Sequence, residues 1–204
     1  ITTLNDVAID VERICARSSL PILVDIDTGW GGAFNISRAI NTLEKAGAAA
    51  IHIEDQVQQK RCGHRPNKAL VSKAEMKDRI KAAADARICD DFVIMARTDS
   101  LAQYGLEAAI DIMGECIDAG ADMVFPEAVS ELAIYKKITE SITVPVLANI
   151  TEFGLTPLFT TDELIGAGVK IALYPLSAFR AANQAALNVY QQIIATGSQQ
   201  SVLE

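Results

Sequence analysis

Three segments of the chain share one construction, in which a helical pattern ends at glycine and an apolar run begins at once. They read KAGAAAIHIED, DAGADMVFPEA and GAGVKIALYPL, and their turn glycines are Gly47, Gly120 and Gly168. Glycine accepts the left-handed conformation that closes a helix. Runs of Val, Ile, Leu and Ala without alternation are typical of strands buried on both faces. The repeated unit therefore predicts a parallel α/β fold.

Apolar runs of this kind divide the whole chain. Helical patterns lie between them, a first helix is expected over residues 1–17 with Thr2 or Thr3 as its cap, and a long last helix over Ser177–Thr196. The six expected strands are Pro21–Asp27, Ala49–Asp55, Phe92–Asp99, Met123–Glu127, Val144–Thr151 and Val169–Pro175.

Two architectures accommodate six such units. An eight-fold (β/α)8 TIM barrel usually needs about 250 residues, and 204 residues fall short of that by roughly two βα units. The chain is therefore either an open six-stranded sheet or a TIM barrel, here incomplete with about six units and the first two missing. An open sheet that binds a dinucleotide needs a glycine-rich turn after its first strand. The nearest segment, TGWGG at residues 28–32, lacks that spacing and follows two aspartates.

Polar residues favour the barrel. They gather where the expected strands end, and five strands ending in polar side chains at one edge are typical of a barrel active site. These residues are Asp25, Asp27, His52, Glu54, Asp55, Arg97, Asp99, Glu127, Asn149 and Thr151.

Composition limits the partners and the location. We interpret residues 1–204 as one catalytic domain. The net charge of −8 argues against nucleic acid, and no run of about eighteen apolar residues predicts a membrane span. The four cysteines form no C-x-x-C pair, which indicates free thiols in a reducing, cytoplasmic setting.

The first strand ends in a pair of carboxylates. Asp25 and Asp27 are two residues apart, so on a strand they would share a face. Carboxylate oxygens with remaining positions left to water and substrate predict a Mg²⁺ site. Glu54, at the end of the next strand, would bind the metal directly or through water. His52, two residues before Glu54, either belongs to this site or is a hydrogen-bonded histidine of the core.

A basic loop surrounds one cysteine. The segment KRCGHRPNK places Lys60, Arg61 and His64 around Cys62 and Gly63. Positive neighbours favour a thiolate. For Arg65 and Lys68 we expect solvated surface charge instead.

The motifs in chain order carry a resemblance. VDIDTGWG, HIEDQVQQKRCGHRPNK, MARTD, FPEA, ANITEFG and YPLSAFRAAN resemble the isocitrate lyase/phosphoenolpyruvate mutase superfamily, and within it the 2-methylisocitrate lyase family. The K-[KR]-C-G-H loop marks the lyase branch. Members are (β/α)8 barrels that begin with two further βα units, including a Ser-Gly-Gly segment and a tyrosine near the chemistry. The resemblance thus implies that the chain is incomplete at its N-terminus. The base that removes the proton from the substrate hydroxyl stays unassigned.

The resemblance implies a carbon–carbon lyase. It would cleave 2-methylisocitrate to pyruvate and succinate in the methylcitrate cycle of propionate breakdown, with Mg²⁺ at Asp25 and Asp27 and Cys62 as proton donor. Glu54, Lys60, Arg61 and His64 would support the site. The implied substrate-binding residues are Cys62, Gly63, Arg97, Glu127, Asn149, Ile150, Thr151 and Arg180.

Several alternatives remain open at this stage. The same scaffold serves isocitrate lyases, phosphonate mutases and oxaloacetate-type decarboxylases. The chain could also be a non-enzyme, a fragment or degenerate paralogue retained for assembly. The last helix of superfamily members is exchanged between subunits, which implies a homo-oligomer, commonly a tetramer. With the first two units missing, we expect the strands at residues 21–27 and 169–175 not to pair with each other.

Overall fold

Strands and helices alternate along the chain in a computed structural model that describes residues 2–203. The strands are β1 (Leu23–Asp25), β2 (Ala50–Glu54), β3 (Val93–Thr98), β4 (Met123–Pro126), β5 (Leu147–Asn149) and β6 (Ile171–Leu173). The α-helices are α1 (Leu4–Cys15), α2 (Ala33–Lys45), α3 (Lys73–Ala86), α4 (Leu101–Tyr104), α5 (Leu106–Asp118), α6 (Leu132–Ser141), α7 (Thr161–Gly166) and α8 (Ser177–Thr196). A 3₁₀ turn over Gln200–Val202 follows.

Every expected strand is present, each shorter than its apolar run. The long last helix has the expected bounds. The first helix is shorter than expected: Thr3 caps it through a hydrogen bond from the Asp6 backbone N–H, and residue 1 lies outside the described residues. Between the strands, α3 and α6 had no clear sequence signal, because α3 carries many charged residues and α6 is short.

The three repeated junctions end their helices in the same way. Gly47, Gly120 and Gly168 adopt φ values of 99°, 110° and 82°. In each, the residue after glycine donates its N–H back to a carbonyl five residues earlier, as Ala48 does to Leu43 at 3.0 Å. This is the Schellman closure that glycine permits.

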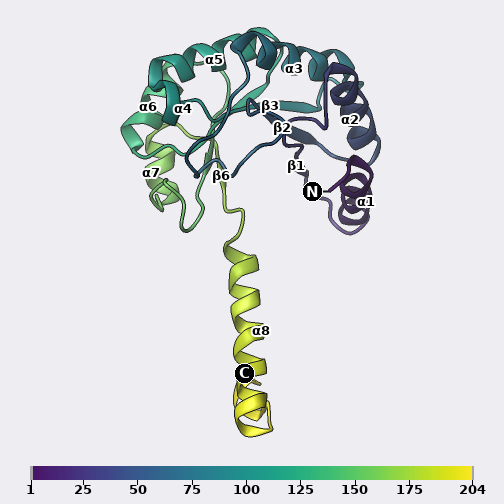
Figure 1. Cartoon of the computed structure of the whole chain (residues 1–204), viewed down its shortest axis with the longest axis vertical. Helices are drawn as coiled ribbons and strands as arrows, with labels where there is room; N and C mark the ends of the chain where they lie inside the picture. The colour runs from purple at the N-terminus through teal and green to yellow at the C-terminus, as the bar shows by residue number, and fades with distance from the viewer. Residues whose placement is uncertain (1, 204) are drawn as a thin grey trace.

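All the recorded strand pairs are parallel. The order β1-β2-β3-β4 forms one sheet and β5-β6 a second, and a bridge between Val124 and Val146 joins them. Helices α1 to α7 arch over the outside of the strands (Figure 1). Among the described residues β1 pairs with β2 and β6 with β5, which confirms that the two end strands do not pair with each other.

Two apolar layers flank the strands. The larger one fills the space between strands and outer helices and includes Ile26, Ile51 and Ile94. The inner face has a small cluster of Met95, Phe125 and Leu147. Side chains therefore alternate between the helix layer and the barrel interior, and polar groups lie at the carboxyl ends of the inner face.

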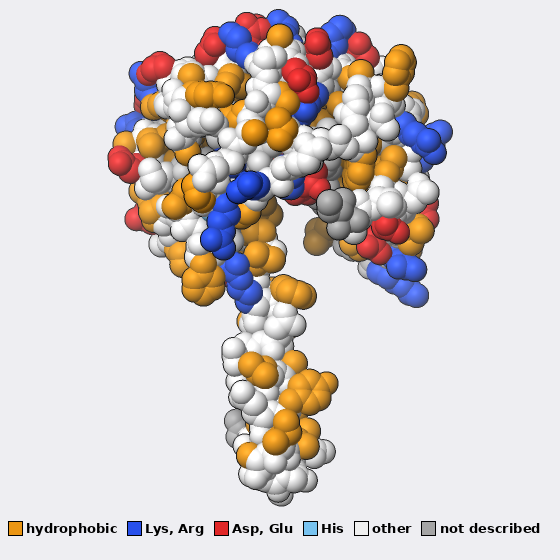
Figure 2. Space-filling view, viewed as in Figure 1, with side chains coloured by type: hydrophobic (Ala, Val, Ile, Leu, Met, Phe, Trp, Pro, Cys, Tyr) orange, Lys and Arg blue, Asp and Glu red, His pale blue; other side chains and the backbone are white. Residues whose placement is uncertain are grey.

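Helix α8 leaves the body. It projects from the arch as a stalk (Figure 1), and no residue along it is buried. Apolar side chains cover part of its surface (Figure 2), including Leu187, Tyr190 and Ile194, which are 48%, 66% and 85% exposed. Within residues 2–203, every helix is too short or too polar to span a bilayer.

Candidate active site

A buried charge cluster occupies the carboxyl ends of β2, β3 and β4. Strand register places Glu54 beside Arg97, and Glu127 follows β4 directly. The Arg97 Nε lies 3.2 Å from Glu54 and 3.1 Å from Asp99, while its Nη2 lies 3.0 Å from Glu127. Three buried protein carboxylates therefore engage Arg97, so it organises the site more than it reaches out to a substrate.

Burial and neighbouring charge give the two glutamates, Glu54 and Glu127, different pKa values. Burial raises the pKa of Glu54 to about 7, although Arg97 and Lys60 oppose this. Burial alone would also raise the pKa of Glu127, but a hydrogen bond from His64 and the charge of Arg97 prevail and bring it to about 2. One carboxyl therefore takes up a proton near neutrality, whereas the other stays ionised.

Asp25 ends β1 and Asp27 lies beyond it, so the two aspartates do not share a strand face as expected. The strand ends at Asp25, and Asp27 has a left-handed φ of 50°. Asp27 donates its backbone N–H to Asp25 Oδ1 at 2.8 Å, and both side chains are 48% exposed. A tight turn, not strand alternation, therefore brings the two carboxylates together.

Lys60 lies between a carboxylate of the turn after β1 and one at the end of β2. Its ammonium is 2.6 Å from Asp27 and 3.5 Å from Glu54. Burial lowers the pKa of Lys60, but the hydrogen bond to Asp27 and the charge of Glu54 raise it above its usual value. The position of the Lys60 ammonium between these carboxylate oxygens is evidence that the oxygens favour a positive charge.

His52 lies beside this pair. Its Nδ1 is 3.6 Å from Asp25, its ring packs edge-on against Phe125, and burial lowers its pKa. We therefore interpret it as a neutral core histidine at the site edge.

The cysteine loop sits on the charge cluster. Cys62 is exposed, whereas the next residue, Gly63, is buried. A Cβ on Gly63 would lie 2.3 Å from Glu127 Cγ and 2.6 Å from Arg97 Nη2. Glycine is thus required for the loop to approach the strand ends this closely.

The basic residues of this loop do not gather on the thiol as expected. Lys60 contacts carboxylates, and Arg61 bonds to Gln56 through its backbone. Lys68 is not the solvated charge we expected: it is buried, and its ammonium contacts Gly63 O at 2.5 Å and Asp99 at 2.9 Å. Sequence reasoning missed it because nothing local distinguishes it from Arg65, which is exposed.

The loop after β5 supplies further expected residues. Asn149 Nδ2 lies 3.3 Å from Glu127 Oε1, and Thr151 is buried nearby in sequence. The Ile150 side chain packs in the cluster against the helices, so a contact of Ile150 with substrate would come from its backbone. Its strand neighbours therefore face the opposite way.

Arg180 contacts residues outside the charge cluster. Its Nη1 is 2.7 Å from Glu152 Oε2, and its guanidinium stacks 5.0 Å over the Phe153 ring. It joins the start of α8 to the loop after β5.

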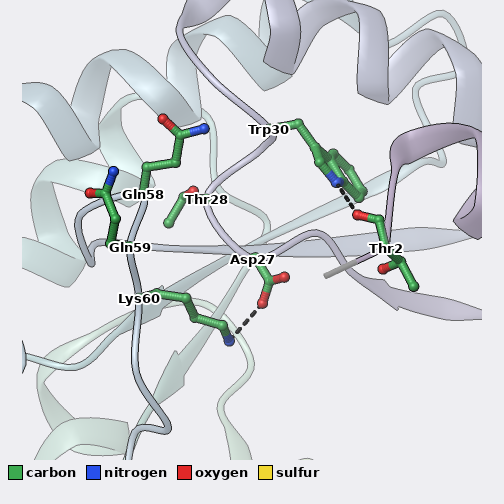
Figure 3. Close-up of a pocket in the computed structure, with 7 residues that line it drawn as sticks. All are labelled: Thr2, Asp27, Thr28, Trp30, Gln58, Gln59 and Lys60. Carbon is green, nitrogen blue, oxygen red and sulfur yellow. Dashed lines mark hydrogen bonds and ion pairs between the residues drawn. The ribbon is translucent and has the colours of Figure 1, made fainter.

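A cavity opens beside the Asp27–Lys60 pair. Its volume is about 640 Å³ (Figure 3), and Trp30 on its wall donates Nε1–H to Thr2 O at 3.2 Å. Figure 3 shows Asp27 and Lys60 pointing toward each other at this opening. Residues 2–203 hold no group of three or more His, Cys, Asp or Glu placed to ligate a metal. Any metal here would rely on two aspartates with water or substrate.

The fold and this site define a barrel of the phosphoenolpyruvate phosphomutase kind. Residues 2–194 match that family, and the chain belongs to it. Among solved structures, 2,3-dimethylmalate lyase superposes with a TM-score of 0.92 at 36% identity, covering 98% of this chain and 67% of that one. Phosphonopyruvate hydrolase, solved with oxalate and Mg²⁺, superposes with a TM-score of 0.87 at 29% identity, covering 100% and 71%.

Curated relatives narrow the family further. The chain is 59% identical to the 2-methylisocitrate lyase of Vibrio cholerae and 60% identical to that of Escherichia coli strain K12. Both alignments cover 100% of this chain and 68% and 69% of those proteins. The chain thus groups with the 2-methylisocitrate lyases of its family.

Proposed function

We propose that this protein cleaves 2-methylisocitrate to pyruvate and succinate, a step of propionate breakdown through the methylcitrate cycle. The observation that carries the proposal is the cysteine loop, in which Gly63, the residue after the exposed Cys62, is buried against Arg97 and Glu127. High identity to 2-methylisocitrate lyases supports the substrate. The four free thiols among the described residues support a reducing, cytoplasmic location.

The proposed cleavage balances with one proton donor and one base. The substrate hydroxyl loses its proton, its oxygen becomes the ketone of pyruvate, and the carbon–carbon bond breaks. The bonding pair stays on the succinate carbon, which takes a proton from the Cys62 thiol. Cys62 recovers a proton before the next turnover.

The charges around the site fit a divalent cation. The cations Lys60, Lys68 and Arg97 are outnumbered by carboxylates. These carboxylates belong to Asp25, Asp27, Glu54, Asp99 and Glu127. A tricarboxylate would be repelled by such an excess of negative charge. Asp25 and Asp27 would hold Mg²⁺, which supplies polarisation of the substrate's hydroxy-acid oxygens when bound.

A coupled assay tests the proposed function. Pyruvate release from 2-methylisocitrate is measured beside glyoxylate release from isocitrate, with Mg²⁺ and with chelator. We expect Mg²⁺-dependent pyruvate release. Isocitrate cleavage should be about 10–200-fold slower but measurable, because one methyl group is worth about 1–3 kcal/mol in a pocket. Faster isocitrate cleavage would identify the protein as an isocitrate lyase.

Replacing Asp27 by alanine is expected to abolish Mg²⁺-dependent turnover. The change removes one of two aspartate ligands and also the partner of Lys60 at 2.6 Å. Calorimetric titration with Mg²⁺ checks the binding part directly. Asp10→Ala, an exposed aspartate paired with Arg13, is the matched control. Turnover and Mg²⁺ affinity like wild type in Asp27→Ala would reject the metal assignment.

We propose further that the protein is a homo-oligomer, a tetramer by resemblance, which α8 helps to assemble. Leu187, Tyr190 and Ile194 lie on one helical face and are exposed in the single chain. Light scattering is expected to give a mass several times that of one chain. Tyr190→Glu together with Ile194→Glu should lower that mass, whereas Gln191→Glu should not. A wild-type monomer would contradict this proposal.

A further inference from the structure

His64 bridges two loops that are far apart in sequence. Its Nδ1 accepts a hydrogen bond from the Leu155 backbone N–H at 2.9 Å. Its Nε2 lies 3.0 Å from Glu127 Oε1. The imidazole thus joins the cysteine loop, the loop after β5 and a carboxylate of the charge cluster.

These contacts fix which ring nitrogen carries the proton. An N–H donor approaches Nδ1, so Nδ1 must present its lone pair. The proton then resides on Nε2, where it faces a carboxylate oxygen. In this arrangement both ring nitrogens of His64 have partners outside the cysteine loop, which differs from the cationic neighbour of the thiol that the sequence suggested.

The contact with the second loop is close because of glycine. A Cβ on Gly154 would lie 2.9 Å from both Cε1 and Nδ1 of the His64 ring. A side chain at position 154 would therefore force the His64 ring or the Thr151 methyl group, which lies at the same distance, to shift.

Before Cys62, two hydrogen bonds of 2.9 Å between the Gln56 side chain and the Arg61 backbone hold the cysteine loop. A cavity of about 440 Å³ borders residues 63–68, together with Gln103 and Leu155. Lys68 fixes Gly63 from the strand side, and the Val57 N–H bonds to Ala69 O at 2.9 Å at the loop's base. His64 connects the cysteine loop to the loop after β5.

We propose that His64 is a positioning residue that latches the cysteine loop to the backbone of Leu155, and through it places Cys62 for the proton transfer. The proposal rests on the proposed function for its catalytic consequence, but the latch itself is a property of the protein without substrate. Its signature is Nδ1 as acceptor, whatever the reaction.

Ring-nitrogen NMR tests the tautomer. The chain has two histidines, so the ¹⁵N signals of His64 are assigned by comparison with His64→Asn. We expect the Nε2–H tautomer in the substrate-free protein at neutral pH. A proton on Nδ1, in a neutral or a cationic ring, would overturn the proposal.

Hydrogen exchange of the Leu155 amide tests the latch with a matched pair of substitutions. The amide oxygen of asparagine can take the place of Nδ1, whereas the amide of glutamine reaches the place of Nε2. We therefore expect the Leu155 exchange rate to stay within about threefold in His64→Asn and to rise about tenfold or more in His64→Gln and His64→Ala. The Val57 amide and the Arg65→Ala variant are controls that should not change.

Kinetics separate positioning from mere structure. A misplacement of about 1 Å can lower a reaction rate about 10²-fold. We therefore expect kcat of His64→Gln to fall about 10–10²-fold, with KM changed much less. The kcat of His64→Asn should stay closer to wild type. Unchanged Leu155 exchange in His64→Ala, or a kcat of His64→Gln within about threefold of wild type, would overturn the proposal. A wild-type protein that does not cleave 2-methylisocitrate would instead reject the proposed function, while the exchange result would still decide the latch.

Discussion

An Arg97→Ala variant is expected to lose about 3–5 kcal/mol of free energy of unfolding, the usual cost of removing one partner from a buried ion pair. Arg97 is 6% exposed and contacts Glu54, Asp99 and Glu127. Without it, three carboxylates remain buried around the cavity left by the guanidinium. The change also removes its stacking on the Phe125 ring, 5.0 Å from the centroid.

The loss should depend on pH in a defined direction. The Arg97 charge lowers the pKa of both Glu54 and Glu127, so its removal raises both. A group whose folded pKa is raised stabilises the fold below its unfolded pKa, and this stability is lost as pH rises through the folded pKa. Urea unfolding should therefore show a larger loss at pH 8 than at pH 5.

Arg13→Ala is the matched control for this prediction. It breaks an exposed pair with Asp10, in which both side chains are more than two-thirds exposed, and should change the stability by less than about 1 kcal/mol. If Arg97→Ala cost no more than Arg13→Ala at pH 8, the charge cluster would contribute little to the fold.

The fold was largely predictable because its signals are local. A glycine after a helix and a run of branched apolar residues each act within about ten residues, so all six strands and α8 were located. The strands proved shorter than their apolar runs because residues such as Ile26 and Ile150 remain buried beyond the paired segments. Helix α3 escaped because its charged surface, with Lys73, Lys77 and Lys81, obscures its buried stripe.

The site was predictable in position but not in its internal contacts. Strand-end polarity located Glu54, Arg97 and Glu127 at one edge. What sequence could not give is which partner each charge takes, since this depends on contacts between residues distant in the chain. Lys68 reaches Asp99, 31 residues away, and His64 reaches Leu155, 91 residues away.

A Cys62→Ser variant is expected to lose about 10²–10⁴-fold in turnover, the usual contribution of general acid catalysis. Serine keeps the size of the side chain, but its hydroxyl is a far weaker acid than a thiol. Cys62 is exposed, so the substitution disturbs no packing and should leave the unfolding midpoint unchanged. The neighbouring Gly63 keeps its seat on Arg97 and Glu127, so substrate binding should change much less than the rate.

Cys89→Ser supplies the matched control for the role of the thiol. It makes the same change at another exposed cysteine, in the connection between α3 and β3, and should retain wild-type turnover. Single-turnover measurement with 2-methylisocitrate separates the chemical step from binding. A Cys62→Ser variant within about threefold of wild type in that step would show that another group protonates the succinate carbon. The exposed Cys62 thiol would then have no part in the proton transfer.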